Sequence, residues 1–515
     1  MSKISQVTRA AGSITIAVFL SRILGLIREQ VLAYFFGAGR SMDAFVVAYR
    51  IPNLLRDLFA EGALGAAFTK VFSASLVKHP KEKSFQIACI LISNILVVLL
   101  VVVLVLALFS PQIVSLIAPD FEKEPDKFWL TVNLTRIMMP FLLFISLSAV
   151  VAGMLNSLKV FFLPALSSAV FNLVCIVIGV SGYYLAREKG TPPIYAMGVG
   201  VLLGGAAQLA FQLPALFKKG FKFKFKVNFR LPEMKEIARL VFPVIFGLSV
   251  VQINIFINTF FATSCGEGAV SWYSYAFRIM YVPLGLFGVG LSQALLPELT
   301  KQITEGNFSQ AKELYARCLV VSLSLSLPSA IGLYAFSEEV VKVLFERGAF
   351  GVRDTYFTSQ LLKILSFSLP FYAFSKTTVP LFYSVSRTII PALGSVLAVI
   401  TNLAVILLTI KLLSIKAVAL GTSVSLLVQA VFLLLVATYF LGSPFNKYTA
   451  KSVFFLILAG LFLYGAIFLS KEIFASPLMR LILGIPFAGG VYLVFLRLFA
   501  PSDTYLFFKR FFPFL

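Results

Sequence analysis

The chain has 515 residues, of which 59% are hydrophobic and 13% are charged, and its mean hydropathy is +0.95. Soluble domains carry roughly a quarter charged residues, so this composition excludes a soluble globular protein and indicates a polytopic membrane protein. The net charge of +22 does not indicate nucleic-acid binding, because the basic residues gather in a few short loops, as the positive-inside rule expects, and not on one soluble face.

Apolar segments long enough to cross a bilayer, about 20 residues each, recur along the whole chain. They predict an all-α integral membrane protein with about fourteen transmembrane helices. The first apolar run resembles a signal peptide, but it continues past Arg22 without an A-x-A-like cleavage site, so we expect a retained helix. The expected spans are 10–34, 42–68, 85–109, 128–156, 161–186, 194–217, 237–263, 269–297, 311–335, 356–384, 389–411, 415–441, 449–470 and 478–499.

Loop charges orient these helices. The basic stretches KHPKEK (78–83) and FKKGFKFKFKVNFR (217–230) fall on the N-terminal side of the membrane, whereas the acid-rich APDFEKEPDK (118–127) falls on the other side. Both termini are therefore expected in the cytoplasm. Lys411 and Lys416 are exceptions, because the helix count places them outside.

An internal repeat divides the chain. AYRIPNLLRDLFAEGALGAAF aligns without gaps on AFRIMYVPLGLFGVGLSQALL, LPALSSAV matches IPALGSVL, and Ala196, Gly200, Gln208 and Phe211 recur as Ala417, Gly421, Gln429 and Phe432. Because an even number of helices returns the chain to the same side, two six-helix units predict parallel lobes, an arrangement found among secondary transporters.

The predicted domains are an N-terminal lobe (1–217), a basic cytoplasmic linker (218–236), a C-terminal lobe (237–441), and helices 13–14 with a cytoplasmic tail (442–515). The Phe/Lys alternation of the linker is as consistent with a simple anchor for the sixth helix as with an active role.

Ionisable residues inside the predicted spans are the main functional signal, because a charge at the bilayer centre costs at least a few kcal/mol and normally faces a partner or a wet cavity. They include Arg22, Arg28 and Glu29 in the first span, Asp43, Arg50, Arg56, Asp57 and Glu61 in the second, Arg136 in the fourth and Arg278 in the eighth. Taken singly, Arg22 could extend to the cytoplasmic edge and Arg50 could pair with Asp57. Taken together, several arginines facing one cavity indicate an anionic substrate that carries phosphate.

The stretches SRILGLIRE, FGAGRSMDAF, RIPNLLRDLFAEGALGAAF and SWYSYAFRIMYVPLG together resemble the MurJ (MviN) family of bacterial lipid II flippases, within the multidrug/oligosaccharidyl-lipid/polysaccharide exporter superfamily. The resemblance implies a transporter, not an enzyme, that moves lipid II, the undecaprenyl-diphosphate-linked precursor of peptidoglycan, across the bacterial inner membrane by alternating access. It implies lipid II, membrane phospholipids and the cell-wall synthesis machinery as partners.

The family's residues carry over by position. The resemblance implies that Arg22, Arg28, Arg56 and Arg278 are the central-cavity arginines, and that Glu29, Asp43 and Glu61 are the acidic residues, with Asp43 near the periplasmic gate. Arg50 is added to these gating or ion-pair residues from its place in the second span. Helices 13–14 would form a groove for the lipid tail.

Two positions depart from the family pattern. Phe277 stands where many members have Asp before the arginine of the eighth helix. Where some members have a sodium site with carboxylates, this chain offers the neutral Asn254, Asn258, Thr401 and Asn402, and a site without carboxylates would hold sodium less tightly. We expect no cofactor and expect the membrane potential to supply energy; sodium coupling stays open.

Three alternative functions make different demands on the cavity. A flippase for another polyprenyl-linked oligosaccharide, such as an O-antigen or capsule unit, would need the same diphosphate recognition. A cationic-drug exporter should have an acidic cavity. A membrane enzyme needs an activated base or a metal cluster, and the only histidine, His79, lies in an expected loop.

Overall fold

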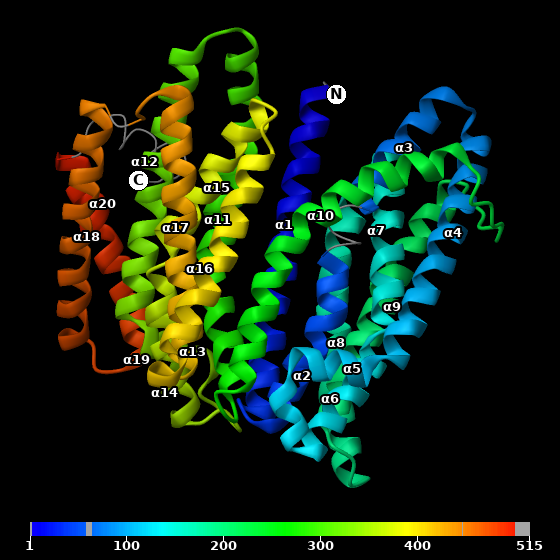
Figure 1. Ribbon diagram of the computed structural model, residues 1–515, viewed down its shortest axis with the longest axis horizontal. Coiled ribbons are helices and arrows are strands. Elements are labelled where there is room, and N and C mark those ends of the chain that lie inside the picture. Colours follow the sequence, from blue (N-terminus) through cyan, green and yellow to red (C-terminus); the bar gives the residue numbers. More distant parts are fainter. Residues whose placement is uncertain (1–2, 58–63, 445, 500–515) are drawn as a thin grey trace. The chain divides into compact units, whose positions relative to one another are not determined.

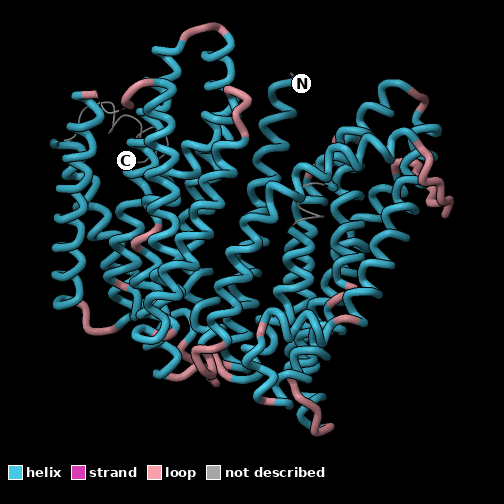
Figure 2. The backbone as a smooth tube through the Cα atoms, viewed as in Figure 1, coloured by secondary structure: helices cyan, strands magenta, loops and turns pink. Residues whose placement is uncertain are grey.

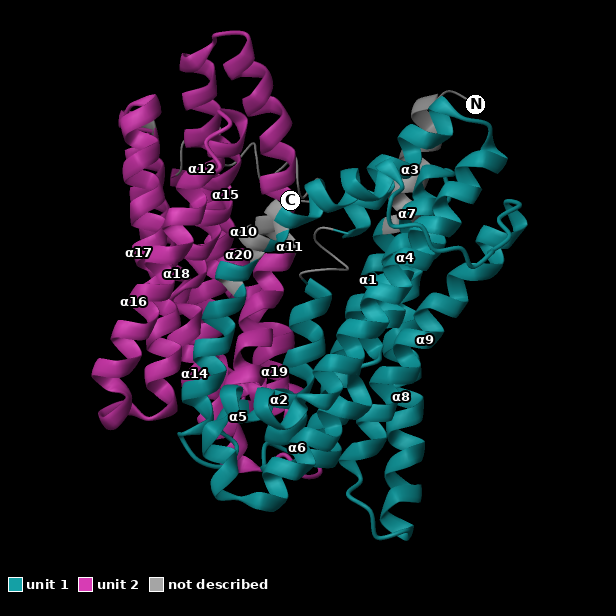
Figure 3. Ribbon diagram, turned by 45° about the vertical axis from the view of Figure 1, so that its right-hand side comes forward, with its two compact units in different colours: residues 1–270 teal, residues 271–515 magenta. Residues whose placement is uncertain are grey.

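The computed structural model describes residues 3–57, 64–444 and 446–499, and every regular element in these ranges is a helix (Figures 1 and 2). Helices suit a bilayer because they satisfy all their backbone hydrogen bonds within one segment. The chain forms two compact units, residues 1–270 and 271–515, which are coloured separately in Figure 3 and are described one at a time below.

The first unit contains both long and short helices. They are α1 (Lys3–Phe36), α2 (Arg40–Leu55), α3 (Gly65–Lys78), α4 (Lys81–Leu108), α5 (Ser110–Ile117), η2 (Pro119–Lys123), α6 (Pro125–Met138), α7 (Phe141–Ser157), α8 (Phe162–Glu188), α9 (Ile194–Lys218) and α10 (Pro232–Thr263).

The second unit starts within α11. Its helices are α11 (Ala269–Thr304), α12 (Phe308–Ala335), α13 (Ser337–Phe345), α14 (Val352–Ser366), α15 (Leu369–Ser384), α16 (Ile389–Leu413), α17 (Ile415–Leu441), α18 (Lys447–Ile473), α19 (Pro477–Met479), η3 (Arg480–Gly484) and α20 (Ile485–Phe499).

In the described residues the expected spans coincide with helices, and the all-α multi-pass class is confirmed. Among the residues that the structure describes, nine helices are long and apolar enough to cross a membrane, or ten if the bent pair Ala269–Gly285 and Gly290–Thr304 counts as one span. The expected number of fourteen is therefore not confirmed. Two expected spans, 128–156 and 356–384, are each divided between two helices, and Pro140 lies at the first of these divisions. Part of the expected span 42–68 lies outside the described residues.

The two most extensive helix pairings, α8 with α9 and α16 with α17, occupy equivalent places in the internal repeat. Gly204 of α9 lies so close to α8 that a Cβ atom there would come within 2.9 Å of the Phe171 carbonyl oxygen. In the second unit, a Cβ at Gly421 of α17 would lie 3.1 Å from the Asn402 carbonyl oxygen of α16. Small residues at such contacts let the backbones approach, which is how helices associate when lipid surrounds them.

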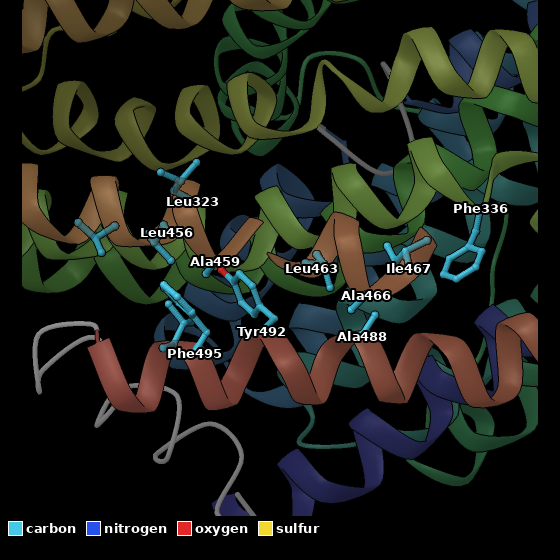
Figure 4. Packing of buried hydrophobic residues seen from close by; sticks show 12 residues of the cluster. Leu323, Phe336, Leu456, Ala459, Leu463, Ala466, Ile467, Ala488, Tyr492 and Phe495 are labelled. Atoms are coloured by element: carbon cyan, nitrogen blue, oxygen red, sulfur yellow. The ribbon is translucent and has the colours of Figure 1, made fainter. Parts of the chain in front are cut away.

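The last two crossings, α18 and α20, pack on α12 (Figure 4). Leu456 and Leu463 of α18 and Phe495 of α20 belong to the buried cluster, and the Tyr492 hydroxyl donates to the Ser324 carbonyl of α12 at 2.9 Å. At one end of this hairpin the buried Glu339 pairs with Lys471 at 2.8 Å and with Arg480 at 3.4 Å. Apolar contact and ion pairs thus fix the hairpin to the second unit. The domain boundaries expected from the sequence, at 217, 236 and 441, stay predictions.

Candidate functional site

Two charged residues of α1, Arg28 and Glu29, form an ion pair. Arg28 Nη2 lies 2.8 Å from Glu29 Oε1, and the two side chains are only 15% and 8% exposed. The Arg28 guanidinium also lies 5.6 Å from the centre of the Phe171 ring on α8. Asn172 of the same helix donates to the Ser21 carbonyl at 3.2 Å, which holds α8 against α1. The arrangement offers a buried cation whose partners are one carboxylate and one aromatic face.

Arg22, six residues before Arg28 on α1, is exposed. The first span therefore carries a partly buried arginine, Arg28, and an exposed arginine, Arg22.

A second pair lies where α2 ends. Arg56 Nη2 is 3.0 Å from Asp57 Oδ1, and the same carboxylate accepts from the Gln252 amide of α10 at 3.4 Å. Arg50, two turns earlier in α2, is half-buried. Glu61 lies outside the described residues.

Asp43 is fully buried at the start of α2. Its Oδ2 accepts from Lys127 Nζ at 3.3 Å and from the Gly268 backbone N–H at 2.8 Å. Lys127, whose side chain is 3% exposed, also lies 4.2 Å from the centre of the Phe121 ring. One carboxylate therefore joins the starts of α2 and α6 to the loop after α10. Gly37, with φ at +59°, makes the turn from α1 that brings Asp43 there.

Further charges surround this pair and form what we call the Asp43 cluster. The Arg40 backbone N–H donates to Glu267 Oε1 at 2.9 Å, and the Arg40 side chain lies 3.4 Å from Asp126. The sequence marks Asp43 as a gating residue but places Lys127 in the acid-rich loop 118–127, whereas the structure buries Lys127 against Asp43. The sequence feature that points to Lys127 is a cation in the first turn of an apolar helix.

In the second unit Arg278 is a half-buried residue of α11. Phe277, in place of the family's Asp, stacks with Tyr273 at 6.0 Å and with Tyr281 at 6.1 Å between ring centres. This position thus contributes to an aromatic row along α11 and carries no charge. Because Arg278 belongs to the second unit, the convergence of the four arginines on one cavity stays a prediction.

The predicted ion site is likewise divided between units. Asn254 and the buried Asn258 lie on α10, and the buried Asn402 lies on α16 beside Gly421. Within the described ranges, no group of three His, Cys, Asp or Glu side chains could hold a metal ion. The asparagine site stays a prediction.

Fold and charges together define a multi-pass membrane protein of the transporter type. A solved inward-facing MATE family transporter of the MOP superfamily aligns with 82% of this chain and 94% of its own length, with a TM-score of 0.69 and 16% identity, which shows a shared fold. The family model described as "Lipid II flippase MurJ" matches residues 32–484, and the chain belongs to this family.

Individual relatives agree with this assignment. A probable lipid II flippase MurJ of Rhizobium meliloti is 34% identical over 80% of this chain and 77% of its own length. The lipid II flippase MurJ of Burkholderia cenocepacia is 34% identical over 73% of each chain. A solved structure of a lipid II flippase MurJ in an inward closed conformation aligns with 94% of this chain and 98% of its own, with a TM-score of 0.80 and 26% identity.

Proposed function

We propose that this chain moves lipid II from the cytoplasmic to the periplasmic leaflet of a bacterial inner membrane, with both termini in the cytoplasm. The observation that carries this proposal is the match of residues 32–484 to the lipid II flippase family, which includes the ionisable residues of the second and eighth predicted spans. The full-length structural similarity to a flippase of that name supports it.

The substrate's diphosphate would bind to Arg22, Arg28, Arg56 and Arg278. Arginine suits this role because its planar fork donates two parallel hydrogen bonds to phosphate oxygens. In the structure Arg28 pairs with Glu29 and Arg56 pairs with Asp57. These carboxylates limit the cost of a buried cation, and an arriving diphosphate would compete with them for the same donors.

Transport would follow alternating access, in which two parallel lobes rock about a fixed site. The headgroup would enter from the cytoplasmic side while the polyprenyl tail stays in lipid beside α18 and α20. The Asp43 cluster would hold the periplasmic ends of α2, α6 and α10 together in one of the two states, because its buried pair must separate if these ends move apart.

Rescue of a bacterium depleted of its own lipid II flippase tests the proposal. We expect the wild-type chain to restore growth, and Arg28→Ala and Arg278→Ala to fail at equal membrane levels, because each removes phosphate donors. Arg317→Ala is the matched control, since Arg317 forms an exposed i,i+4 pair with Glu313 on α12 and is expected to rescue fully.

The outcomes separate the alternatives. Rescue by all three variants would keep the transport function and reject the arginine site. Failure of a well-expressed wild-type chain would instead favour a flippase for another polyprenyl-diphosphate-linked oligosaccharide, of the O-antigen or capsule type.

A further inference from the structure

The segment between α9 and α10, residues 219–231, contains no helix and lies along the first turns of α4 (Figure 2). Lys226 N–H donates to Ser93 Oγ at 3.1 Å, and Asn228 exchanges two hydrogen bonds with the Asn94 side chain, at 2.9 and 2.8 Å. Near its start, Lys81 of α4 donates to the Lys219 carbonyl at 2.7 Å. The segment is therefore bound to α4 along its length and is not a free tether.

From residue 221 onward, the backbone groups that bond to α4 belong to even-numbered residues, Lys222, Lys226 and Asn228. In an extended chain alternate backbone groups point to the same edge, and successive side chains point to opposite faces. One face then carries the apolar residues Phe221, Phe223, Phe225, Val227 and Phe229, and the opposite face carries Lys222, Lys224, Lys226, Asn228 and Arg230.

Most of the apolar face is uncovered by the protein. Phe221 is buried, but Phe223 is 45% exposed, Phe225 is 62% exposed and Phe229 is 48% exposed. The three lysines between them are exposed too, and none forms an ion pair with another residue that the structure describes. The exposed phenylalanines favour an apolar environment on one side of the segment. The exposed lysines favour anions on the other side.

The place where the segment binds α4 brings it to the edge of the membrane, where both an apolar environment and anions are present. A crossing of about 20 residues that ends with the helix at Leu108 begins near Cys89. Cys89, Ser93 and Asn94, which hold the segment, then lie within the first turns below the edge of the hydrocarbon. At that depth aromatic side chains enter the region between headgroups and acyl chains, and lysines extend to the lipid phosphates.

We propose that residues 221–230 form an interfacial membrane-contact segment that inserts its phenylalanines at the hydrocarbon edge and collects anionic phospholipid headgroups with Lys222, Lys224 and Lys226. Each cation near an anionic surface favours binding, so the local lipid composition beside α4 is enriched in acidic lipids. This inference goes beyond substrate transport and does not depend on the identity of the transported lipid.

The test places the whole chain in nanodiscs of phosphatidylcholine alone or of equal parts phosphatidylcholine and phosphatidylglycerol. Phe225→Trp provides the probe, and the emission of the parent protein, which has Trp129 and Trp272, is subtracted. We expect the added emission to be quenched by a lipid with a doxyl group near the headgroup and protected from aqueous acrylamide. We also expect energy transfer to dansyl-phosphatidylglycerol to exceed transfer to dansyl-phosphatidylcholine several-fold.

In the same background, Lys222→Gln, Lys224→Gln and Lys226→Gln combined should abolish the preference for dansyl-phosphatidylglycerol while the depth of the probe changes little. The matched control removes three exposed lysines elsewhere, Lys70→Gln, Lys78→Gln and Lys301→Gln, and should keep the preference. Quenching by acrylamide and not by the doxyl lipid, in both lipid mixtures, would overturn the insertion. A preference that survives loss of the three segment lysines would overturn the recognition of acidic lipids.

Discussion

At the scale of single residues, three charged residues of the first unit that are buried or partly buried each form an ion pair with an opposite charge. Glu29 faces Arg28, Asp57 faces Arg56, and Asp43 faces Lys127. The first two pairs join neighbours in sequence, whereas the third joins residues from two helices. Asp43 and Lys127 are also the most deeply buried of these, so their pairing matters most for stability: removing one partner leaves an uncompensated charge.

We predict that Asp43→Asn destabilises the first unit by about 3 kcal/mol, because the Lys127 ammonium loses its counter-ion in a site closed to water. Thermal unfolding in detergent measures the change. Asp43→Asn combined with Lys127→Met should be more stable than Asp43→Asn alone, since the stranded charge is then absent. Glu313→Gln, which breaks the exposed pair with Arg317, should cost less than about 1 kcal/mol. Strictly additive effects of the Asp43 and Lys127 substitutions would contradict the coupling.

At the scale of elements, close backbone approach organises the helix pairs. Lipid surrounds these helices, so packing contacts replace the hydrophobic effect as the main attraction between them. Gly200 of α9 and Gly421 of α17, which are equivalent in the repeat, both lie at such contacts: a Cβ atom would lie 3.0 Å from the Cys175 carbonyl oxygen of α8 and 3.1 Å from the Asn402 carbonyl oxygen of α16.

Gly204→Ala should lower the melting temperature by several degrees, because its Cβ would lie 2.9 Å from the Phe171 carbonyl oxygen and 2.8 Å from Cys175 Sγ. Alanine is otherwise the better helix former by about 1 kcal/mol. Gly465→Ala in α18, where a Cβ meets nothing within 4 Å, should therefore be neutral or stabilising. Fluorescence-detected size exclusion after heating compares the two. Equal stability of both variants would show that α8 can move away from α9 at little cost.

At the scale of the whole molecule, we propose that the membrane potential drives the return of the empty transporter. Each unit charge that crosses the membrane field is worth about 2.3 kcal/mol per 100 mV. Arginines freed after release of the diphosphate would be drawn toward an inside-negative cytoplasm, and no bound ion is then required.

Turnover of fluorescent lipid II in proteoliposomes should rise when potassium and valinomycin impose an inside-negative potential, for molecules whose cytoplasmic face lies inside. Replacing sodium by choline should leave the rate unchanged, because the predicted ion site has only neutral asparagines. A turnover rate that does not change with the potential but falls without sodium would contradict both the dependence on potential and the independence of sodium. It would leave the transport function intact.

Sequence reasoning singled out Arg28, Arg56 and Asp43, but it identified few of the residues that contact them. Arg28 and Glu29 are adjacent, so their pairing is within reach of a local pattern. Lys127 lies far from Asp43 in the chain, and nothing in either neighbourhood specifies the other. The linker's alternation of Phe and Lys was visible, but its attachment to Ser93 and Asn94 was not.

The sequence by itself determined that the chain is an all-helical, multi-pass membrane protein of the lipid II flippase family, with arginines in its first spans. It could do so because hydrophobicity, loop charge and helix length act along one dimension, and a bilayer permits little besides helices for such segments. Only the tertiary structure decided where expected spans divide, which carboxylate receives Lys127, and where the linker binds α4. These depend on contacts between segments far apart in the chain, whose geometry is set by packing and not by any local pattern.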